Sequence, residues 1–226
     1  MTTLALRAGR QAWALVAKDL LVEWRSKEVF SAMVLYVTVV LVVYNFAFEF
    51  RRDTVAALAP GVLWTAVIFA GLLGLGRTFA AEQDQGTLEG LLLCPVDRGL
   101  IFLGKLLASL LFMLLVEALI VPLFVTLFDV PLSIPALVPL LLLGSFGFAI
   151  LGTLFAAMAA HTRARELLLP LLLLPLVVPV VIAGVRGTQV LVSGEGSLSA
   201  WLNLLAGFDL IFLGVVYPLF EYGLEG

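Results

Sequence analysis

Charged residues are scarce in this sequence. Asp, Glu, Lys and Arg make up 13% of its 226 residues, whereas hydrophobic residues make up 62%. Soluble domains carry about 25% charged residues, and a chain this apolar cannot bury all its hydrophobic surface inside one globular core. The scarcity of charge therefore excludes a soluble domain and indicates an integral membrane protein.

Cysteine and histidine are almost absent, with one residue of each, Cys94 and His161. A single thiol cannot form an internal disulfide, and neither residue has the companions that a metal site needs. We interpret His161, close to Arg163 and Arg165, as an exposed residue near partner contacts. The net charge of −3 argues against a nucleic-acid partner. We therefore predict no metal site and no cofactor bound by this chain.

Long apolar runs are what the sequence has in abundance. A helix needs about 20 apolar residues to cross a hydrocarbon layer about 30 Å thick, and the runs do not alternate as the strands of a barrel would. Six runs meet this requirement: residues 29–48, 56–76, 100–128, 136–160, 167–185 and 201–220. We predict an all-α integral membrane protein, one membrane domain over residues 1–226 with six transmembrane helices and an outer loop at residues 186–200.

Lys and Arg lie mostly on one side of these predicted spans. Ten of the 13 precede the first span or lie in or beside the second and fourth connections: Arg7, Arg10, Lys18, Arg25, Lys27, Arg77, Arg98, Lys105, Arg163 and Arg165. The other side carries Arg51, Arg52 and Arg186. Because positive residues favour cytoplasmic loops, we predict a multi-pass protein of the cell inner (cytoplasmic) membrane with both termini in the cytoplasm.

The segment before the first span, residues 1–28, has the pattern of an amphipathic helix. At 100° per residue its apolar residues fall on one stripe: Leu6, Trp13, Val16, Ala17, Leu20 and Trp24. Polar residues fall on the opposite side: Arg7, Gln11, Lys18 and Arg25. Because Trp rings and cations on such a helix favour the headgroup boundary, we predict an interfacial helix in the cytoplasmic leaflet.

The cytoplasmic segment between the second and third spans, residues 77–99, is rich in polar residues. Gly86 allows a bend, Thr87 can cap a short helix over residues 88–93, and Pro95 ends it. Such a helix is too small to be a domain, but it suits a groove on another protein. An ordinary solvated loop is the alternative interpretation.

This segment also carries a resemblance to a known family. The run "EQDQGTLEGLLLCPVDRGLIFLGK", residues 82–105, resembles the signature of permease subunits of the second type of ABC exporter: an acidic residue, Gly-Thr-Leu-Glu, Pro-Val and Gly-Lys, in this order. Cys94 stands where a Ser is common. The segments "KDLLVEWRSKEVF", "YNFAF" and "LLFMLLVEALIVPLF" resemble the CcmB family, haem exporter protein B of cytochrome c maturation. The resemblance covers nearly the whole chain.

The resemblance implies that residues 82–97, within the cytosolic coupling segment 77–99, form a coupling helix seated in a groove of a separate ABC ATPase, which would bind ATP and magnesium. On physical grounds the carboxylates would contact basic residues of the ATPase, the leucines its apolar groove, and the glycine and proline would shape the segment. The residues concerned are Glu82, Asp84, Gly86, Leu88, Glu89, Leu92 and Pro95. The chain itself is then not an enzyme.

Further partners also follow from the resemblance. It implies a CcmA-like ATPase, CcmC-like and CcmD-like membrane proteins and a haem carrier, with haem handled by the complex. Whether haem is translocated or a loaded carrier is released stays open, as does a homodimer. A generic exporter of a drug, lipid or glycan is the alternative, because the signature of residues 82–105 is shared with such exporters.

Three polar residues within or at the ends of the spans remain as candidates. Glu117 lies in the middle of the third span, and we expect it to face the bundle or a partner, because a charge there costs about 2.5 to 3.5 kcal/mol. A polar clamp between helices and a substrate or gating role are equally favoured. Asp209 and Asn45 are assigned to the outer side, where a haem carrier or the membrane interface could meet them. An intramembrane hydrolase using Glu117 and Asp209 is disfavoured, because no nucleophile or metal set accompanies them.

Overall fold

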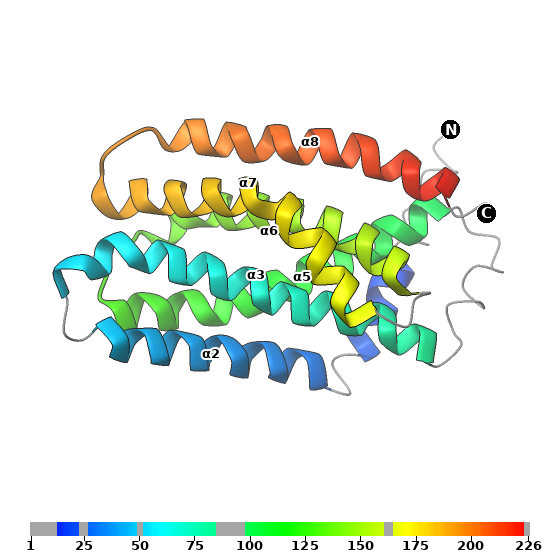
Figure 1. The fold of residues 1–226 in the computed structure, drawn as a ribbon, viewed down its shortest axis with the longest axis horizontal. Coiled ribbons are helices and arrows are strands. Elements are labelled where there is room, and N and C mark those ends of the chain that lie inside the picture. The colour runs from blue at the N-terminus through cyan, green and yellow to red at the C-terminus, as the bar shows by residue number, and fades with distance from the viewer. Residues whose placement is uncertain (1–12, 23–26, 49–51, 85–97, 161–164, 224–226) are drawn as a thin grey trace.

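The computed structural model describes residues 13–22, 27–48, 52–84, 98–160 and 165–223. Six long helices form one bundle (Figure 1): α2 (Glu28–Phe48), α3 (Arg52–Asp84), α5 (Arg98–Phe128), α6 (Ile134–Ala160), α7 (Arg165–Ser193) and α8 (Leu198–Gly223). All six are long and apolar enough to cross a membrane. The predicted fold class, an all-α integral membrane protein with six spans, is therefore confirmed.

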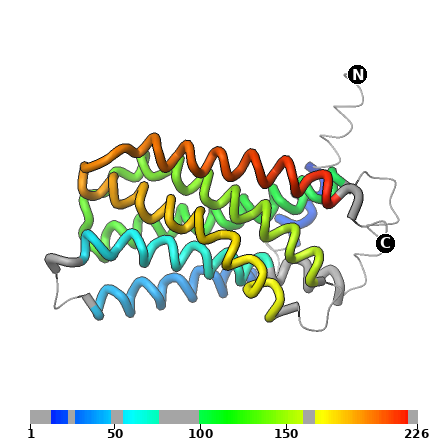
Figure 2. The backbone as a smooth tube through the Cα atoms, turned by 45° about the horizontal axis from the view of Figure 1, so that its top comes forward, coloured from blue at the N-terminus to red at the C-terminus, as the bar shows by residue number. Residues whose placement is uncertain are grey.

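Consecutive helices run antiparallel, so the two ends of the bundle collect different segments. A short helix at residues 13–22 lies at the end where α2, α5 and α7 begin and α3, α6 and α8 finish (Figures 1 and 2). We call this the leader end and the opposite one the loop end. Within the bundle, α6 contacts α3, α5, α7 and α8, whereas α2 lies at the edge against α3 and α5. The core is thus organised around α6 and α3.

The centre of the bundle is closed around Trp64 of α3, which is fully buried. A Cβ on Gly144 of α6 or on Gly184 of α7 would collide with the indole ring, so both glycines let their helices approach it. The indole Nε1 donates a hydrogen bond of 2.9 Å to Thr188 Oγ1, and that hydroxyl donates to the Gly184 carbonyl at 2.8 Å. We call Trp64, Gly144, Gly184 and Thr188 the Trp64 cluster, and it joins three helices.

Helix α7 is longer than the sequence predicted. It continues to Ser193, and α8 begins at Leu198, so the predicted loop at residues 186–200 is wrong over most of its length. Residues 190–192 continue the helix with apolar side chains. The helix ends where Gly194 takes a φ of +72° and its N–H donates to the Val190 carbonyl at 2.9 Å, a terminal geometry that favours glycine. The three prolines of α7, Pro170, Pro175 and Pro179, accompany its bent course (Figure 1).

The short helix at residues 13–22 packs one side against the bundle, a contact that the prediction of an interfacial helix did not include. Val16 and Asp19 are buried on that side, whereas Trp13 is 65% exposed. Leu21 and Val22 share the exposed side with Trp13. A charged contact with α5, described below, involves the buried Asp19. Its outward side remains apolar, as the membrane interface favours.

Candidate functional site

The predicted coupling segment lies largely outside the described residues. Glu82 and Asp84 belong to the last turn of α3, and their side chains are not described. Five other predicted contact residues lie outside the described residues altogether: Gly86, Leu88, Glu89, Leu92 and Pro95. His161 is outside them as well. The coupling role of the seven predicted contact residues stays a prediction.

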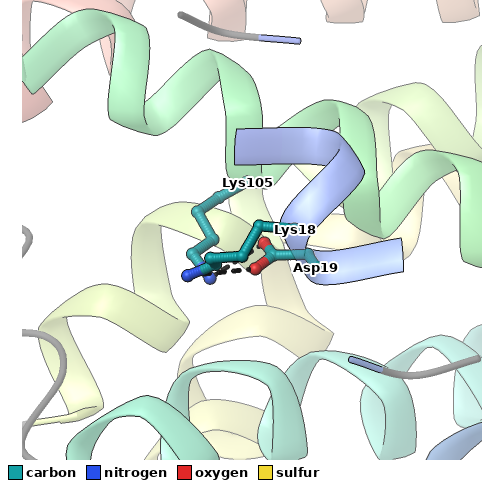
Figure 3. Close-up of polar contacts among 3 residues, drawn as sticks. All are labelled: Lys18, Asp19 and Lys105. Atoms are coloured by element: carbon teal, nitrogen blue, oxygen red, sulfur yellow. Dashed lines mark ion pairs between the residues drawn. The ribbon is translucent and has the colours of Figure 1, made fainter. Parts of the chain in front are cut away.

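Directly after that segment, the structure shows a buried ion pair that the sequence did not predict. Lys105 of α5 is 1% exposed, and its Nζ lies 2.9 Å from Asp19 Oδ2 of the short helix (Figure 3). Lys18 reaches the other carboxylate oxygen at 3.3 Å and is partly exposed. Because a lone buried charge costs several kcal/mol, Asp19 and Lys105 depend on each other. The pair therefore fastens residues 13–22 to the first turns of α5.

Sequence reasoning treated Lys105 only as a cytoplasmic cation and assigned no role to Asp19. The signal available was weak: Asp19 lies three residues after Val16, so the two share one face of a helix. An acid on a face that packs against the bundle needs a buried partner. Which of the nearby cations supplies it depends on how two separate helices dock.

Glu117 lies midway along α5 and is 3% exposed, so the expectation that it faces the bundle is confirmed. Its Oε1 accepts a hydrogen bond from the Ser145 hydroxyl of α6. Its Oε2 has no hydrogen-bond partner among the described residues. The contact is the geometry of a clamp between α5 and α6, and a second oxygen remains for another polar group.

Asp209 lies near the middle of α8 rather than toward an outer end, which corrects the sequence-based assignment. It is 4% exposed, and its carboxylate packs against Gly147 at the midpoint of α6, where a Cβ would meet Oδ1. Twelve residues into α8, it lies roughly 17 Å from the loop end at 1.5 Å per residue. Neither oxygen has a hydrogen-bond partner among the described residues.

Asn45 lies near the loop end of α2, where its side-chain amide donates to the Leu127 carbonyl of α5. It is thus a helix-to-helix contact near the loop end, whereas Asp209 lies near the middle of α8. Glu117 and Asp209 are also separate: they meet α6 at Ser145 and Gly147, and two residues along a helix point in nearly opposite directions. The two carboxyls therefore do not form the paired site that an intramembrane hydrolase would require.

Metal-binding groups are also lacking in the described part of the chain, where no cluster of three or more His, Cys, Asp or Glu side chains could hold an ion. The polar residues described here join helices to one another: Asp19 with Lys105, Glu117 with Ser145, and Asn45 with Leu127. Fold and site together define a multi-pass helical membrane protein whose buried polar groups connect its spans.

Comparison with known proteins identifies the family. The family model described as "CcmB protein" matches residues 10–220. The chain is 32% identical over 208 residues to the heme exporter protein B of Rhodobacter capsulatus, covering 90% of this chain and 93% of that protein. It is also 32% identical over 194 residues to the protein of that name from Paracoccus denitrificans, covering 85% of this chain and 89% of that protein. The identity to the Pseudomonas aeruginosa protein of that name is 32% over 199 residues, covering 87% of this chain and 89% of that protein. The chain belongs to the CcmB family.

Proposed function

We propose that this protein is the permease subunit of an ABC transporter complex that exports haem, or releases a loaded haem carrier, for cytochrome c maturation. The observation that carries the proposal is the extent of the match to heme exporter protein B, which spans 90% of this chain and 93% of the relative. Shared architecture over the full set of spans supports a shared transport role better than a signature confined to one loop.

In this proposal the chain is not catalytic, and a CcmA-like ATPase supplies the energy from ATP and magnesium. The ATPase would hold residues 77–99 in a groove, with contacts from Glu82, Asp84, Leu88, Glu89 and Leu92. The positive-inside distribution supports placing this segment and both termini in the cytoplasm, with the protein in the inner membrane. CcmC-like and CcmD-like proteins and a haem carrier complete the complex.

The ion pair of Lys105 with Asp19 suggests how force would spread from that segment. Lys105 lies seven residues after the start of α5 at Arg98, a rise of roughly 10 Å. Because a buried ion pair is costly to break, displacement of the coupling segment would move α5 and residues 13–22 together. The short helix would then transmit the motion along the membrane surface.

A first experiment tests the cargo. The chromosomal gene is deleted and covalently bound haem in c-type cytochromes is measured by haem staining, with the intact gene on a plasmid as the control. The proposal expects loss of c-type cytochromes and recovery on complementation. Normal cytochromes c in the deletion strain would contradict haem delivery and favour a generic exporter.

A second experiment tests the coupling segment. Glu89→Lys reverses one predicted contact charge, and Glu195→Lys makes the same change at an exposed residue of the loop end. We expect Glu89→Lys to lose the ATPase in copurification from membranes while inserting at normal levels, and Glu195→Lys to retain it. Equal ATPase recovery with both variants would contradict the assigned role of Glu89.

A further inference from the structure

The first turns of α5 are held by α8 as well as by the short helix. An ideal Cβ on Gly99 would lie 2.6 Å from the Tyr217 hydroxyl oxygen and 2.8 Å from Cζ of the same ring. The Tyr217 ring therefore lies directly on the Gly99 backbone, in space that a side chain would occupy. Three residues further along each helix, the Phe102 and Phe220 rings pack with centroids 5.1 Å apart. Because residues three apart share a helix face, one face of each helix makes these contacts, and we call the four residues the α5/α8 contact.

The α5/α8 contact is closely packed. Phe102 is fully buried, Phe220 is 6% exposed, and Gly99 is buried. Pushing the helices together would compress atoms that already touch, and pulling them apart would open a cavity between buried rings. A displacement of the first turn of α5 is therefore passed on to the last turns of α8 rather than absorbed between them.

The position of this contact along the chain ties it to the predicted coupling segment. Gly99 is the last residue of that segment, residues 77–99, and the second residue of α5. Tyr217 lies in the last two turns of α8. The ion pair of Lys105 with Asp19 follows within the next two turns of α5. The end of the coupling segment is thus joined to α8 on one side and to the short helix on another.

Helix α8 has room to move on its outward side. Leu210 is 73% exposed, Ile211 64% and Leu219 54%, so no other helix of the described chain covers this side. Toward α6, neither oxygen of the Asp209 carboxylate has a hydrogen-bond partner among the described residues. A helix with an open outward side and no hydrogen bond from its buried carboxylate can shift at a smaller cost than the helices packed around Trp64.

We propose that the coupling segment drives α8 directly, and that Tyr217 is the positioning residue that carries the motion from Gly99 to this helix. The inference rests on the proposed function, because it takes residues 77–99 as the segment that the ATPase moves. Glycine is required at position 99 because any side chain would push the ring off the backbone. Phe102 and Phe220 support the ring contact one turn away. When the segment is displaced, α8 shifts relative to the edge helix α2.

The test follows α8 in the complex with its ATPase, in lipid nanodiscs. In a Cys94→Ser background, spin labels at Leu219→Cys of α8 and Leu35→Cys of α2, both exposed positions, report the distance between the helices by pulsed electron paramagnetic resonance. A non-hydrolysable ATP analogue should shift this distance by at least about 2 Å relative to ADP. Tyr217→Ala should abolish the shift, and Tyr217→Phe, which keeps the ring, should retain most of it.

Two further substitutions separate transmission of motion from packing. Phe212→Ala removes a partly buried ring of α8 that packs on Phe208 of the same helix with centroids 4.4 Å apart, and it should leave the shift unchanged. Gly99→Ala should lose the shift, because its Cβ displaces the Tyr217 ring. Gly99→Ala/Tyr217→Ala should not regain it, because the contact is still missing. A double variant that regains the shift would assign the Gly99 effect to a collision alone and overturn the proposal.

The outcomes distinguish this inference from the function on which it rests. If the ATPase copurifies but the label on α8 does not respond to nucleotide, or responds equally in Tyr217→Ala, the role of Tyr217 is overturned and the permease function stands. Failure of the ATPase to copurify with the otherwise unaltered chain would overturn the permease function itself. In cells, covalently bound haem in c-type cytochromes should fall with Tyr217→Ala and persist with Tyr217→Phe. Normal cytochromes c with Tyr217→Ala would also overturn the role of this residue.

Discussion

The two sides of α6 are packed by opposite means. Toward α3 and α7, glycines bring the helices onto the buried Trp64 ring, whose N–H and the Thr188 hydroxyl both have partners. Toward α5 and α8, two carboxyls, Glu117 and Asp209, are buried with oxygens that have no hydrogen-bond partner in the described part of the chain. A close-packed, fully bonded contact has one good arrangement, whereas partly satisfied polar contacts can be remade. Motion within the bundle is therefore expected on the α5 and α8 side.

Breaking the Trp64 cluster should have the largest effect. Trp64→Ala removes a fully buried ring held by two close helices and the N–H that donates to the Thr188 hydroxyl, so we expect a loss of about 3–5 kcal/mol in stability. The control is Trp13→Ala, at a 65% exposed position, with a change within about 0.5 kcal/mol. The measurement is unfolding in nanodiscs, and equal effects of the two variants would contradict a rigid core at Trp64.

Removing one partner of the buried ion pair comes next. Lys105→Met leaves the Asp19 carboxylate buried without the cation that lies 2.9 Å from it, at a cost of about 3–5 kcal/mol. Because release of residues 13–22 relieves that cost, we expect local detachment from α5 rather than global unfolding. Faster amide hydrogen exchange in residues 13–22 should report this detachment.

The matched controls for the ion pair are a neighbouring lysine and a double variant. Lys18→Met removes a partly exposed cation 3.3 Å from the same carboxylate and should cost no more than about 1 kcal/mol. The double variant Asp19→Asn/Lys105→Met should recover slow exchange in residues 13–22, because no unpaired buried charge remains. Failure of the double variant to recover would assign the Lys105 effect to lost packing.

The clamp between α5 and α6 should give a smaller effect that depends on polarity. Glu117→Leu orphans the Ser145 hydroxyl and should lose about 1–3 kcal/mol, whereas Glu117→Gln keeps an acceptor and should assemble normally. Unfolding and yield from membranes measure the difference. If Glu117→Gln assembles but loses transport while Glu117→Leu is equally stable, Glu117 serves ionisation rather than a clamp.

The smallest effect is expected at the loop end. Asn45→Leu removes the amide that donates to the Leu127 carbonyl and should cost about 1 kcal/mol. Asn203→Leu, at an exposed position of α8, is the matched control and should change stability less. A larger effect at Asn45 than at Glu117 would reverse the ordering of these contacts.

The elements of the fold could be predicted because they follow from local sequence. Six apolar runs of sufficient length specified six spans, and the loop residues Gly194 and Gly196, which take positive φ values, mark where α7 stops. The end of α7 was missed because Arg186, Thr188 and Gln189 look like loop residues. Thr188 instead bonds inside the bundle to Trp64, a partner 124 residues away that no local pattern indicates.

The polar residues likewise fall into two groups: those whose position the sequence could predict and those whose position it could not. The sequence alone determined that Glu117 must face the protein, because the bilayer penalises an exposed carboxylate whatever the fold. It also carried the family resemblance over nearly the whole chain. The local sequence pattern could not show that Asp209 of α8 packs against the midpoint of α6 or that Lys105 pairs with Asp19. It also could not separate Asn45 from Asp209.

Hydropathy is a property of each segment, so the sequence by itself determined membrane insertion, the helical class and the number of spans. Only the tertiary structure decided which buried polar atoms meet, since that depends on the rotation and register of helices that are distant in the chain. Lys105 and Asp19 are 86 residues apart, yet docking of the short helix against α5 brings their charges within 2.9 Å.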